Sequence, residues 1–237
     1  MTAPSSPSPA ISDVAKPVTM RCRGVLFDMD GILISSLGSV ERSWHTWAVS
    51  RGVDPAIAIH TAHGCRAIET VRKLRPDLDD EAELKFIEDL EVADNEGLAV
   101  LPGIQELLAA LPTQRWTVVT SATERLARIR MAAAGITAPE RIITADRVTF
   151  GKPHPEPYLK GAGILGIDPA DCVVFEDSAS GTKAGREAGC TVVGTTFSHS
   201  IEELGAAHYL VTDLTGISVE VLPEDQGLIL HFTPLMA

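Results

Sequence analysis

Residues 24–31, Gly-Val-Leu-Phe-Asp-Met-Asp-Gly, constrain the fold of this 237-residue chain more than any other stretch. Their apolar run has the length and composition of a buried strand. Asp28 and Asp30 follow at its carboxyl end, and Gly31 permits a sharp turn. Alternation in extended backbone points both carboxylates the same way, so their charges repel unless a divalent cation or a shared proton intervenes. The alternative is an Asx turn that merely ends a strand.

Composition limits the classes of protein and partner. The content of 45% hydrophobic and 22% charged residues is that of a globular protein with a sizeable core. A net charge of -12 argues against nucleic acid or anionic membranes as partners. No uncharged apolar run has membrane-spanning length, and the N-terminus lacks a signal segment. The four cysteines form no CxxC pair and indicate reduced thiols. We therefore expect a cytoplasmic protein, with a monomer as the simplest assembly.

The patterning along the chain changes twice. Residues 1–19 are rich in Pro, Ser and Ala, which predicts a disordered tail. Residues 20–37 and 101–237 alternate between continuous apolar strands and helices, which predicts an α/β core with a Rossmann-like parallel sheet. Residues 38–100 carry three helical stripes and no strand, which predicts an inserted all-helical domain.

Two further interpretations concern the edges of these regions. The acidic runs at 77–83 and 88–91 of the helical insertion are interpreted as solvated helix faces. The apolar run at 228–232 could add an edge strand to the sheet.

Polar residues follow several of the predicted strands. Ser121 follows the strand at 116–120, Glu176 and Asp177 follow 172–175, and Lys152 lies in a loop after 141–143. In an open parallel sheet, ligands bind outside the carboxyl ends of the strands. We therefore expect these groups to meet Asp28 and Asp30 at one rim. Carboxylates for a metal, a hydroxyl and an ammonium are the groups that phosphoryl transfer requires.

Four motifs in this order carry a family resemblance. They are Asp28-Met29-Asp30-Gly31, Ser121 in residues 118–122, Lys152 in Gly151-Lys152-Pro153, and Glu176-Asp177-Ser178 with Gly181. With them the chain resembles the haloacid dehalogenase superfamily of phosphatases and phosphomutases, whose helical cap the insertion would form. Residues 62–66 and 152–161 are most similar to its glycerol phosphate and 2-deoxyglucose 6-phosphate phosphatases. The resemblance extends to β-phosphoglucomutase.

The resemblance implies roles for the carboxylates. Asp28 would attack phosphorus and form an aspartyl-phosphate, while Asp30 would protonate the leaving group and then activate water. Mg²⁺ would be held by Asp28, the backbone carbonyl of Asp30 and Asp177, with Glu176 as a ligand or a water-bridged neighbour.

The resemblance also implies substrate contacts. Ser121 and Ala122 would bind phosphoryl oxygens, and Lys152 would supply positive charge to the nucleophile and the transferred group. Arg66 could bind substrate hydroxyls or a second phosphate, the alternative being a solvated arginine at a helix start. His63 is a further candidate for substrate binding, with a structural role as the alternative.

Together with these motifs, the resemblance implies a Mg²⁺-dependent phosphatase that acts on a small sugar or polyol phosphate through an aspartyl-phosphate. One alternative is a hexose phosphomutase similar to β-phosphoglucomutase, in which a second sugar hydroxyl replaces water. Another is a phosphometabolite sensor without catalysis, whose signature would be the loss of Asp28 or Asp30. The identity of the phosphorylated metabolite stays open.

Overall fold

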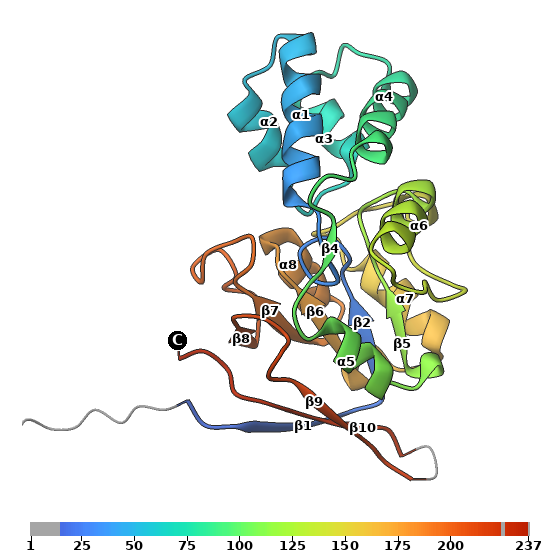
Figure 1. Cartoon of the computed structure of the whole chain (residues 1–237), viewed down its shortest axis with the longest axis vertical. Helices are drawn as coiled ribbons and strands as arrows, with labels where there is room; N and C mark the ends of the chain where they lie inside the picture. Colours follow the sequence, from blue (N-terminus) through green and yellow to red (C-terminus); the bar gives the residue numbers. More distant parts are fainter. Residues whose placement is uncertain (1–14, 224–225, 237) are drawn as a thin grey trace, which may run out of the picture.

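The computed structural model describes residues 15–223 and 226–236 (Figure 1). Most of the tail expected at 1–19 lies outside the described residues. Strand β1 (Val18–Cys22) includes the last part of that range, so the expected boundary at residue 19 falls inside a strand. Within the described ranges, no helix is both long and apolar enough to cross a membrane.

A five-stranded sheet forms the centre of the molecule, in the order β5-β2-β6-β7-β8. Its strands are β2 (Gly24–Phe27), β5 (Trp116–Val118), β6 (Cys172–Glu176), β7 (Thr191–Thr195) and β8 (Tyr209–Val211). Every neighbouring pair in it is parallel. This confirms the predicted α/β class with a Rossmann-like core.

Helices cover both faces of this sheet, as its buried strands require. They are α5 (Ile104–Ala110), α6 (Glu124–Ala133), α7 (Glu156–Leu165) and α8 (Ala179–Glu187), with short 3-10 helices at Thr113–Arg115, Ala145–Arg147 and Pro169–Asp171. Val25 and Phe27 pack into one hydrophobic cluster, whereas Leu26 packs into a second cluster with Tyr158 of α7. Side-chain alternation in β2 therefore divides the core into two layers.

Four helices between residues 37 and 93 stand together at one end of the molecule (Figure 1). They are α1 (Leu37–Arg51), α2 (Pro55–Ala62), α3 (Ala67–Leu74) and α4 (Asp80–Ala93), called the helical part below. Trp44, Trp47 and Ile87 belong to its separate hydrophobic cluster. The chain enters and leaves it through β3 (Ile34–Ser35) and β4 (Ala99–Val100), which pair antiparallel.

Helix α2 was missed by the three predicted stripes. Its signal lies in its first residues, because Asp54 accepts a hydrogen bond from the Ala56 amide at 2.8 Å and Pro55 occupies the first helical position. Only capping chemistry marks this short helix in the sequence.

The run at 228–232 forms β10 (Leu228–Phe232), but it does not join the parallel sheet. It is the middle strand of a separate antiparallel sheet, between β1 and β9 (Ser218–Val221). Leu228, Leu230 and Phe232 are buried while the residues between them are half-buried, which is the pattern of a strand with one covered face. The expected strand at 141–143 is reduced to a single bridge between Ile143 and Val119.

The interpretation of the acidic runs as solvated faces is wrong for two residues, Glu83 and Glu91, which are buried. Glu83 accepts hydrogen bonds from Trp47 Nε1 at 2.7 Å and Arg51 Nε at 2.9 Å. Buried carboxylates require such donors. Some of the acidic side chains of α4 therefore lie inside the protein instead of facing solvent.

Candidate active site

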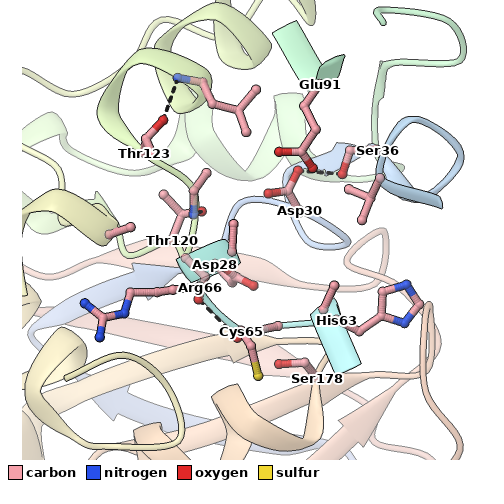
Figure 2. A pocket seen from close by; sticks show the side chains of 18 of the residues that line it. Asp28, Asp30, Ser36, His63, Cys65, Arg66, Glu91, Thr120, Thr123 and Ser178 are labelled. Carbon is pink, nitrogen blue, oxygen red and sulfur yellow. Dashed lines mark hydrogen bonds between the residues drawn. The ribbon is translucent and has the colours of Figure 1, made fainter. Parts of the chain in front are cut away.

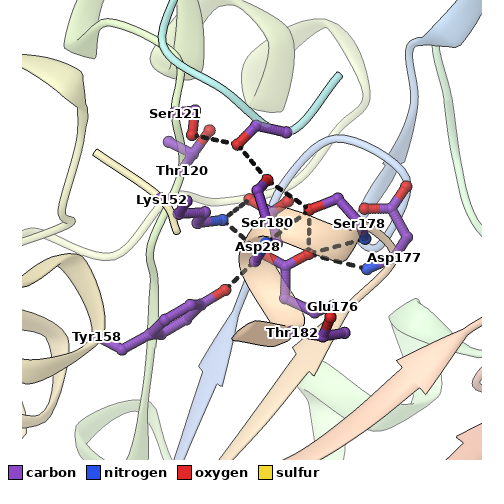
Figure 3. Close-up of polar contacts among 12 residues, drawn as sticks. Asp28, Thr120, Ser121, Lys152, Tyr158, Glu176, Asp177, Ser178, Ser180 and Thr182 are labelled. Atoms are coloured by element: carbon purple, nitrogen blue, oxygen red, sulfur yellow. Dashed lines mark hydrogen bonds and ion pairs between the residues drawn. The ribbon is translucent and has the colours of Figure 1, made fainter. Parts of the chain in front are cut away.

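Four charged side chains from distant segments meet at the carboxyl end of the sheet (Figure 3). Asp28 follows β2, Glu176 ends β6, Asp177 follows it, and Lys152 comes from the loop before α7. Lys152 Nζ lies 2.9 Å from Asp28 Oδ1 and 2.6 Å from Glu176 Oε1. The structure therefore brings together the predicted nucleophile, cation and acidic motif, which we call the inner charge cluster.

Glu176 is held by protein donors at both of its oxygens. Oε1 accepts from Lys152 Nζ at 2.6 Å and from the Tyr158 hydroxyl at 2.7 Å. Oε2 accepts from the backbone amides of Asp177 and Ser178 at 3.0 and 3.1 Å, and from Ser178 Oγ at 3.0 Å. This geometry makes Glu176 an anchor for Lys152 and leaves Asp28 and Asp177 as the less occupied carboxylates.

Tyr158 was not predicted as a site residue. The only signal for it in the sequence is a hydroxyl-bearing aromatic on the buried side of a small-residue helix, since buried tyrosines usually need a hydrogen-bond partner.

The electrostatics of the inner charge cluster favour an additional cation. Burial, reinforced by the charge of Glu176, raises the pKa of Asp28 to about 7. Burial and Glu176 also raise the pKa of Asp177 well above its usual range. Burial alone would lower the pKa of Lys152, but Asp28 and Glu176 outweigh it and raise that pKa, so the ammonium stays charged.

The donor set of this cluster fits a hard divalent ion. Oxygens of Asp28, Glu176 and Asp177 lie within 4.8 Å of one another, and all three residues are buried. Carboxylate oxygens at this spacing suit Mg²⁺, which uses one or two protein carboxylates and completes its shell with other oxygens.

Two glycines let the backbone approach these carboxylates. At Gly31, with φ +79°, a Cβ would lie 1.8 Å from Asp177 Oδ2. At Gly181 a Cβ would lie 1.7 Å from Glu176 Oε1. Any side chain at either position would displace a carboxylate of the cluster, which explains why both motifs contain glycine.

Asp30 has different partners from Asp28. Its Oδ1 accepts from Ser36 Oγ at 2.5 Å and from Arg130 Nη1 at 2.9 Å. Arg130 Nη2 also lies 3.4 Å from Oε1 of Glu91, which reaches toward Asp30 from α4 (Figure 2). We call Asp30, Arg130 and Glu91 the outer charge cluster.

Sequence reasoning missed Arg130 and Glu91. Arg130 is buried on α6, four residues after buried Leu126 and three after buried Ala127. An arginine at helical spacing from core residues was the available signal.

Ser121 and Ala122, the residues predicted to bind phosphoryl oxygens, border the cavity, but their donors have partners in the protein. Ser121 Oγ donates to the carbonyl of Gly64 at 3.0 Å, and Ser180 Oγ donates to the same oxygen at 3.1 Å. The Ala122 amide donates to Thr120 Oγ1 at 3.0 Å. A phosphoryl oxygen would have to replace Gly64 as the acceptor for Ser121.

Arg66 connects the helical part to the core. Its guanidinium donates to the carbonyls of Val148 and Thr149, both at 3.0 Å, and to Glu69 at 2.6 Å. The side chain points away from Asp30 (Figure 2). The alternative of a solvated arginine is wrong because Arg66 is buried, and its guanidinium contacts the loop that leads to Lys152.

His63 lies at the cavity wall, with its ring centroid 6.0 Å from that of His199. Burial, together with the charge of His199, lowers the pKa of His63. Its Nε2 is buried and has no hydrogen-bond partner within the described ranges.

A cavity of about 290 Å³ lies between the helical part and the core (Figure 2). Asp28, Asp30, Asp177 and Ser121 line its core side, and Trp44, Ile68, Leu84 and Glu91 line the opposite side. Its volume is at the low end of small-molecule sites, so a small metabolite is the appropriate size of ligand.

Comparisons with known proteins agree with this geometry. Hexitol phosphatase A of Escherichia coli K12 is 38% identical over 215 residues, which cover 89% of this chain and 100% of that protein. Glycerol-1-phosphate phosphohydrolase 1 of Saccharomyces cerevisiae is 38% identical, with 77% of this chain and 78% of that protein covered. A crystal structure of β-phosphoglucomutase from Clostridium difficile superposes with a TM-score of 0.71 at 20% identity, covering 86% of this chain and 97% of the other, which shows a shared fold.

The family model of haloacid dehalogenase-like hydrolases matches residues 22–189. The predicted enzyme class, phosphoric monoester hydrolase, is confirmed by the relatives. The chain therefore belongs to the haloacid dehalogenase-like hydrolase family, as its four motifs predicted.

Proposed function

We propose that this enzyme hydrolyses a small sugar or polyol phosphate through an aspartyl-phosphate on Asp28, with Mg²⁺ as cofactor. The observation that carries the proposal is the inner charge cluster, in which Asp28 and Asp177 line the cavity and Asp28 pairs with the Lys152 ammonium. The phosphatase names of the two relatives support the substrate class.

The first step forms the covalent intermediate. Lys152 donates to Asp28 Oδ1 at 2.9 Å, which leaves Oδ2 as the attacking oxygen. Asp28 Oδ2 forms a bond to phosphorus while the bond from phosphorus to the substrate's ester oxygen breaks. Asp30 transfers a proton to that departing oxygen, so that an alcohol leaves instead of an alkoxide.

The second step releases phosphate. Asp30, now a carboxylate, takes a proton from water as the water oxygen attacks phosphorus, and the bond between phosphorus and Asp28 breaks. Lys152 and the Ser121 hydroxyl are the groups proposed to stabilise negative charge on the phosphoryl oxygens. In this proposal Ser121 exchanges the Gly64 carbonyl for a phosphoryl oxygen, and the Ala122 amide lies next to it.

Asp28, Asp177 and the backbone carbonyl of Asp30 are the proposed ligands of the cation. When bound, Mg²⁺ would supply positive charge that offsets the repulsion between a phosphate dianion and these carboxylates. Glu176 would hold the Lys152 ammonium in place and would not bind the cation directly, because both of its oxygens already accept protein hydrogen bonds.

The helical part is proposed to act as a cap domain at 38–100 on a core at 20–37 and 101–237. Its separate hydrophobic cluster and the paired linkers β3 and β4 support this division. In this proposal Arg66 and His63 act from the cap side of the cavity, with Arg66 binding the core loop and His63 facing the substrate. Cap opening would admit substrate, and a disulfide between the linkers should slow turnover.

Phosphate release in the presence of Mg²⁺ tests the proposal. The panel is sorbitol 6-phosphate, mannitol 1-phosphate, glycerol 1-phosphate, 2-deoxyglucose 6-phosphate and β-glucose 1-phosphate. Release from one polyol or sugar phosphate that is lost in Asp28→Asn and kept in Asp77→Asn supports the proposal. Asp77 is the control because its side chain is 60% exposed and pairs with Arg75 of the same helical part.

Two other outcomes define the alternatives. Conversion of β-glucose 1-phosphate to glucose 6-phosphate with little free phosphate would indicate a phosphomutase. No turnover of any member would indicate a sensor, although both Asp28 and Asp30 are present at the cavity. The cytoplasmic location and the monomeric state stay predictions, the second open to size-exclusion chromatography with light scattering.

A further inference from the structure

We propose that Arg130 is a positioning residue that orients the Asp30 carboxylate for proton transfer, and that Glu91 completes this contact from the helical part. The inference rests on the proposed function, because it assigns Asp30 the proton-transfer role.

The hydrogen bonds of Asp30 are unequally distributed between its two oxygens. Ser36 Oγ and Arg130 Nη1 both donate to Oδ1, at 2.5 and 2.9 Å. No donor to Oδ2 occurs in the part of the chain that the structure describes. Because two donors hold one oxygen, the carboxylate has one orientation, and Oδ2 is the oxygen available to exchange a proton at the cavity.

Arg130 has the burial and partners that such a role requires. Its side chain is 2% exposed, and within the described ranges its acidic partners are Asp30 and Glu91. A guanidinium removed from water needs charged partners, and its planar geometry fixes the direction of each donor. The contact with Glu91 through Nη2 thus sets the direction in which Nη1 meets Asp30.

The contact with Glu91 links Asp30 to the docking of α4 on α6. Glu88, one helical turn before Glu91 on the same face, accepts from Thr123 Oγ1 and from Arg125 Nη1. Glu88 therefore binds the start of α6 and its N-cap residue Thr123, and Glu91 binds Arg130 farther along the same helix. The orientation of the proton-transfer group would then depend on the helical part being docked.

Substrates with different leaving groups separate this role from a structural one. The alkoxide of a sugar or polyol is a poor leaving group that needs a proton, whereas p-nitrophenolate is a good leaving group that departs without one. The ratio kcat/KM reports only the steps up to transfer of the phosphoryl group to Asp28, so later hydrolysis of the intermediate does not affect it. Loss of correct Asp30 orientation should therefore lower kcat/KM for the polyol phosphate much more than for p-nitrophenyl phosphate.

The experiment measures kcat/KM with Mg²⁺ for both substrates in Arg130→Met, Arg130→Lys and Glu91→Gln. Asp30→Asn is the benchmark, and Arg128→Met is the matched control because Arg128 pairs with Glu124 on the exposed side of α6. We expect Arg130→Met to lose on the order of 10- to 100-fold with the polyol phosphate, within the range of acid–base catalysis, and only a few-fold with p-nitrophenyl phosphate. Arg130→Lys should recover part of the loss, and Glu91→Gln should show a smaller loss of the same selectivity.

Equal losses with both substrates in Arg130→Met, or no loss at all, would overturn the inference. If Arg130→Met does not fold, Arg130→Lys and Glu91→Gln carry the same comparison, and equal losses there would overturn it too. A wild-type enzyme that hydrolyses neither substrate would instead refute the proposed function, on which this inference depends.

Discussion

Asp28 and Asp30 are two residues apart, yet they belong to clusters of different construction. The Asp28 side chain is 7% exposed and pairs with Lys152 beside two further buried acids. The Asp30 side chain is 27% exposed and pairs with Arg130 and Ser36. The two aspartates therefore differ in burial and in the cation that each one contacts. Enzymes assign separate roles to neighbouring carboxylates through such differences in environment.

The two clusters also differ in the parts of the molecule that build them. The inner charge cluster comes entirely from segments at the carboxyl end of the parallel sheet. The outer charge cluster includes Glu91 of α4 and therefore spans the core and the helical part. The helical part reaches the inner cluster only indirectly, through Arg66 on the loop that leads to Lys152. The outer cluster should therefore depend more directly on how the helical part docks.

The largest expected effect separates the two aspartates themselves. Asp28→Asn should lower turnover of every phosphate ester on the order of 10⁴-fold or more, because the nucleophile is lost. Asp30→Asn should lose about 10²- to 10⁴-fold in kcat/KM with a polyol phosphate and much less with p-nitrophenyl phosphate. Steady-state kinetics with both substrates measures this, and the same selectivity in both variants would remove the distinction between the clusters.

Removing the Lys152 ammonium should have the next largest effect, on the stability of the folded protein. Lys152→Met leaves buried carboxylates without their ammonium and should lower the free energy of unfolding by about 3–5 kcal/mol. The control is Lys160→Met, which removes a half-exposed ammonium that pairs with Glu156 and should cost less than about 1 kcal/mol. Urea unfolding measures both values, and similar losses would argue against a special energetic role of the cluster.

Mg²⁺ should raise the free energy of unfolding by binding the carboxylates of the inner charge cluster. At about 100 times its dissociation constant, a ligand that binds only the folded state raises the free energy of unfolding by about 2.7 kcal/mol. We expect such an increase with Mg²⁺ in the wild type and little of it in Asp177→Asn, because Asp177 is a proposed ligand. Unfolding curves with Mg²⁺ or EDTA test this. An unchanged Mg²⁺ effect in Asp177→Asn would exclude Asp177 as a ligand.

The smallest expected effect is a pH dependence of the outer charge cluster. Burial raises the pKa of Glu91 to about 7 from an ordinary value of 4.5. Between these values the folded protein keeps the Glu91 proton and the unfolded chain loses it, so this contribution to stability falls as pH rises. From pH 5 to pH 8, Glu91→Gln should therefore gain about 1–3 kcal/mol relative to the wild type. Urea unfolding across this range measures the difference, and a constant difference would contradict the prediction.

The inner charge cluster could be predicted because each member lies directly after a strand or in a loop that follows one. The carboxyl ends of parallel strands meet at one rim, so Asp28, Glu176 and Asp177 are placed together by topology. Lys152 joins them from the loop before α7. The hydrogen bond from Tyr158 to Glu176 was not predictable in the same way. Tyr158 lies on α7, in the hydrophobic cluster that contains Leu26, and not at a strand end.

Local patterning by itself determined the α/β class, the helical insertion and the motifs of the inner charge cluster. These depend on hydrophobic periodicity, on the succession of strands and helices along the chain, and on the residues that directly follow each strand. All three can be found in the sequence without knowledge of long-range contacts. Tertiary structure alone decided that Arg130 meets Asp30 across 100 residues and Glu91 across 39. It also decided that Arg66 binds the 148–149 carbonyls and that β10 pairs with β1. A buried charge or hydrogen-bonding group must be satisfied by whichever group the fold places beside it. Periodicity carries no information about which distant residue that will be.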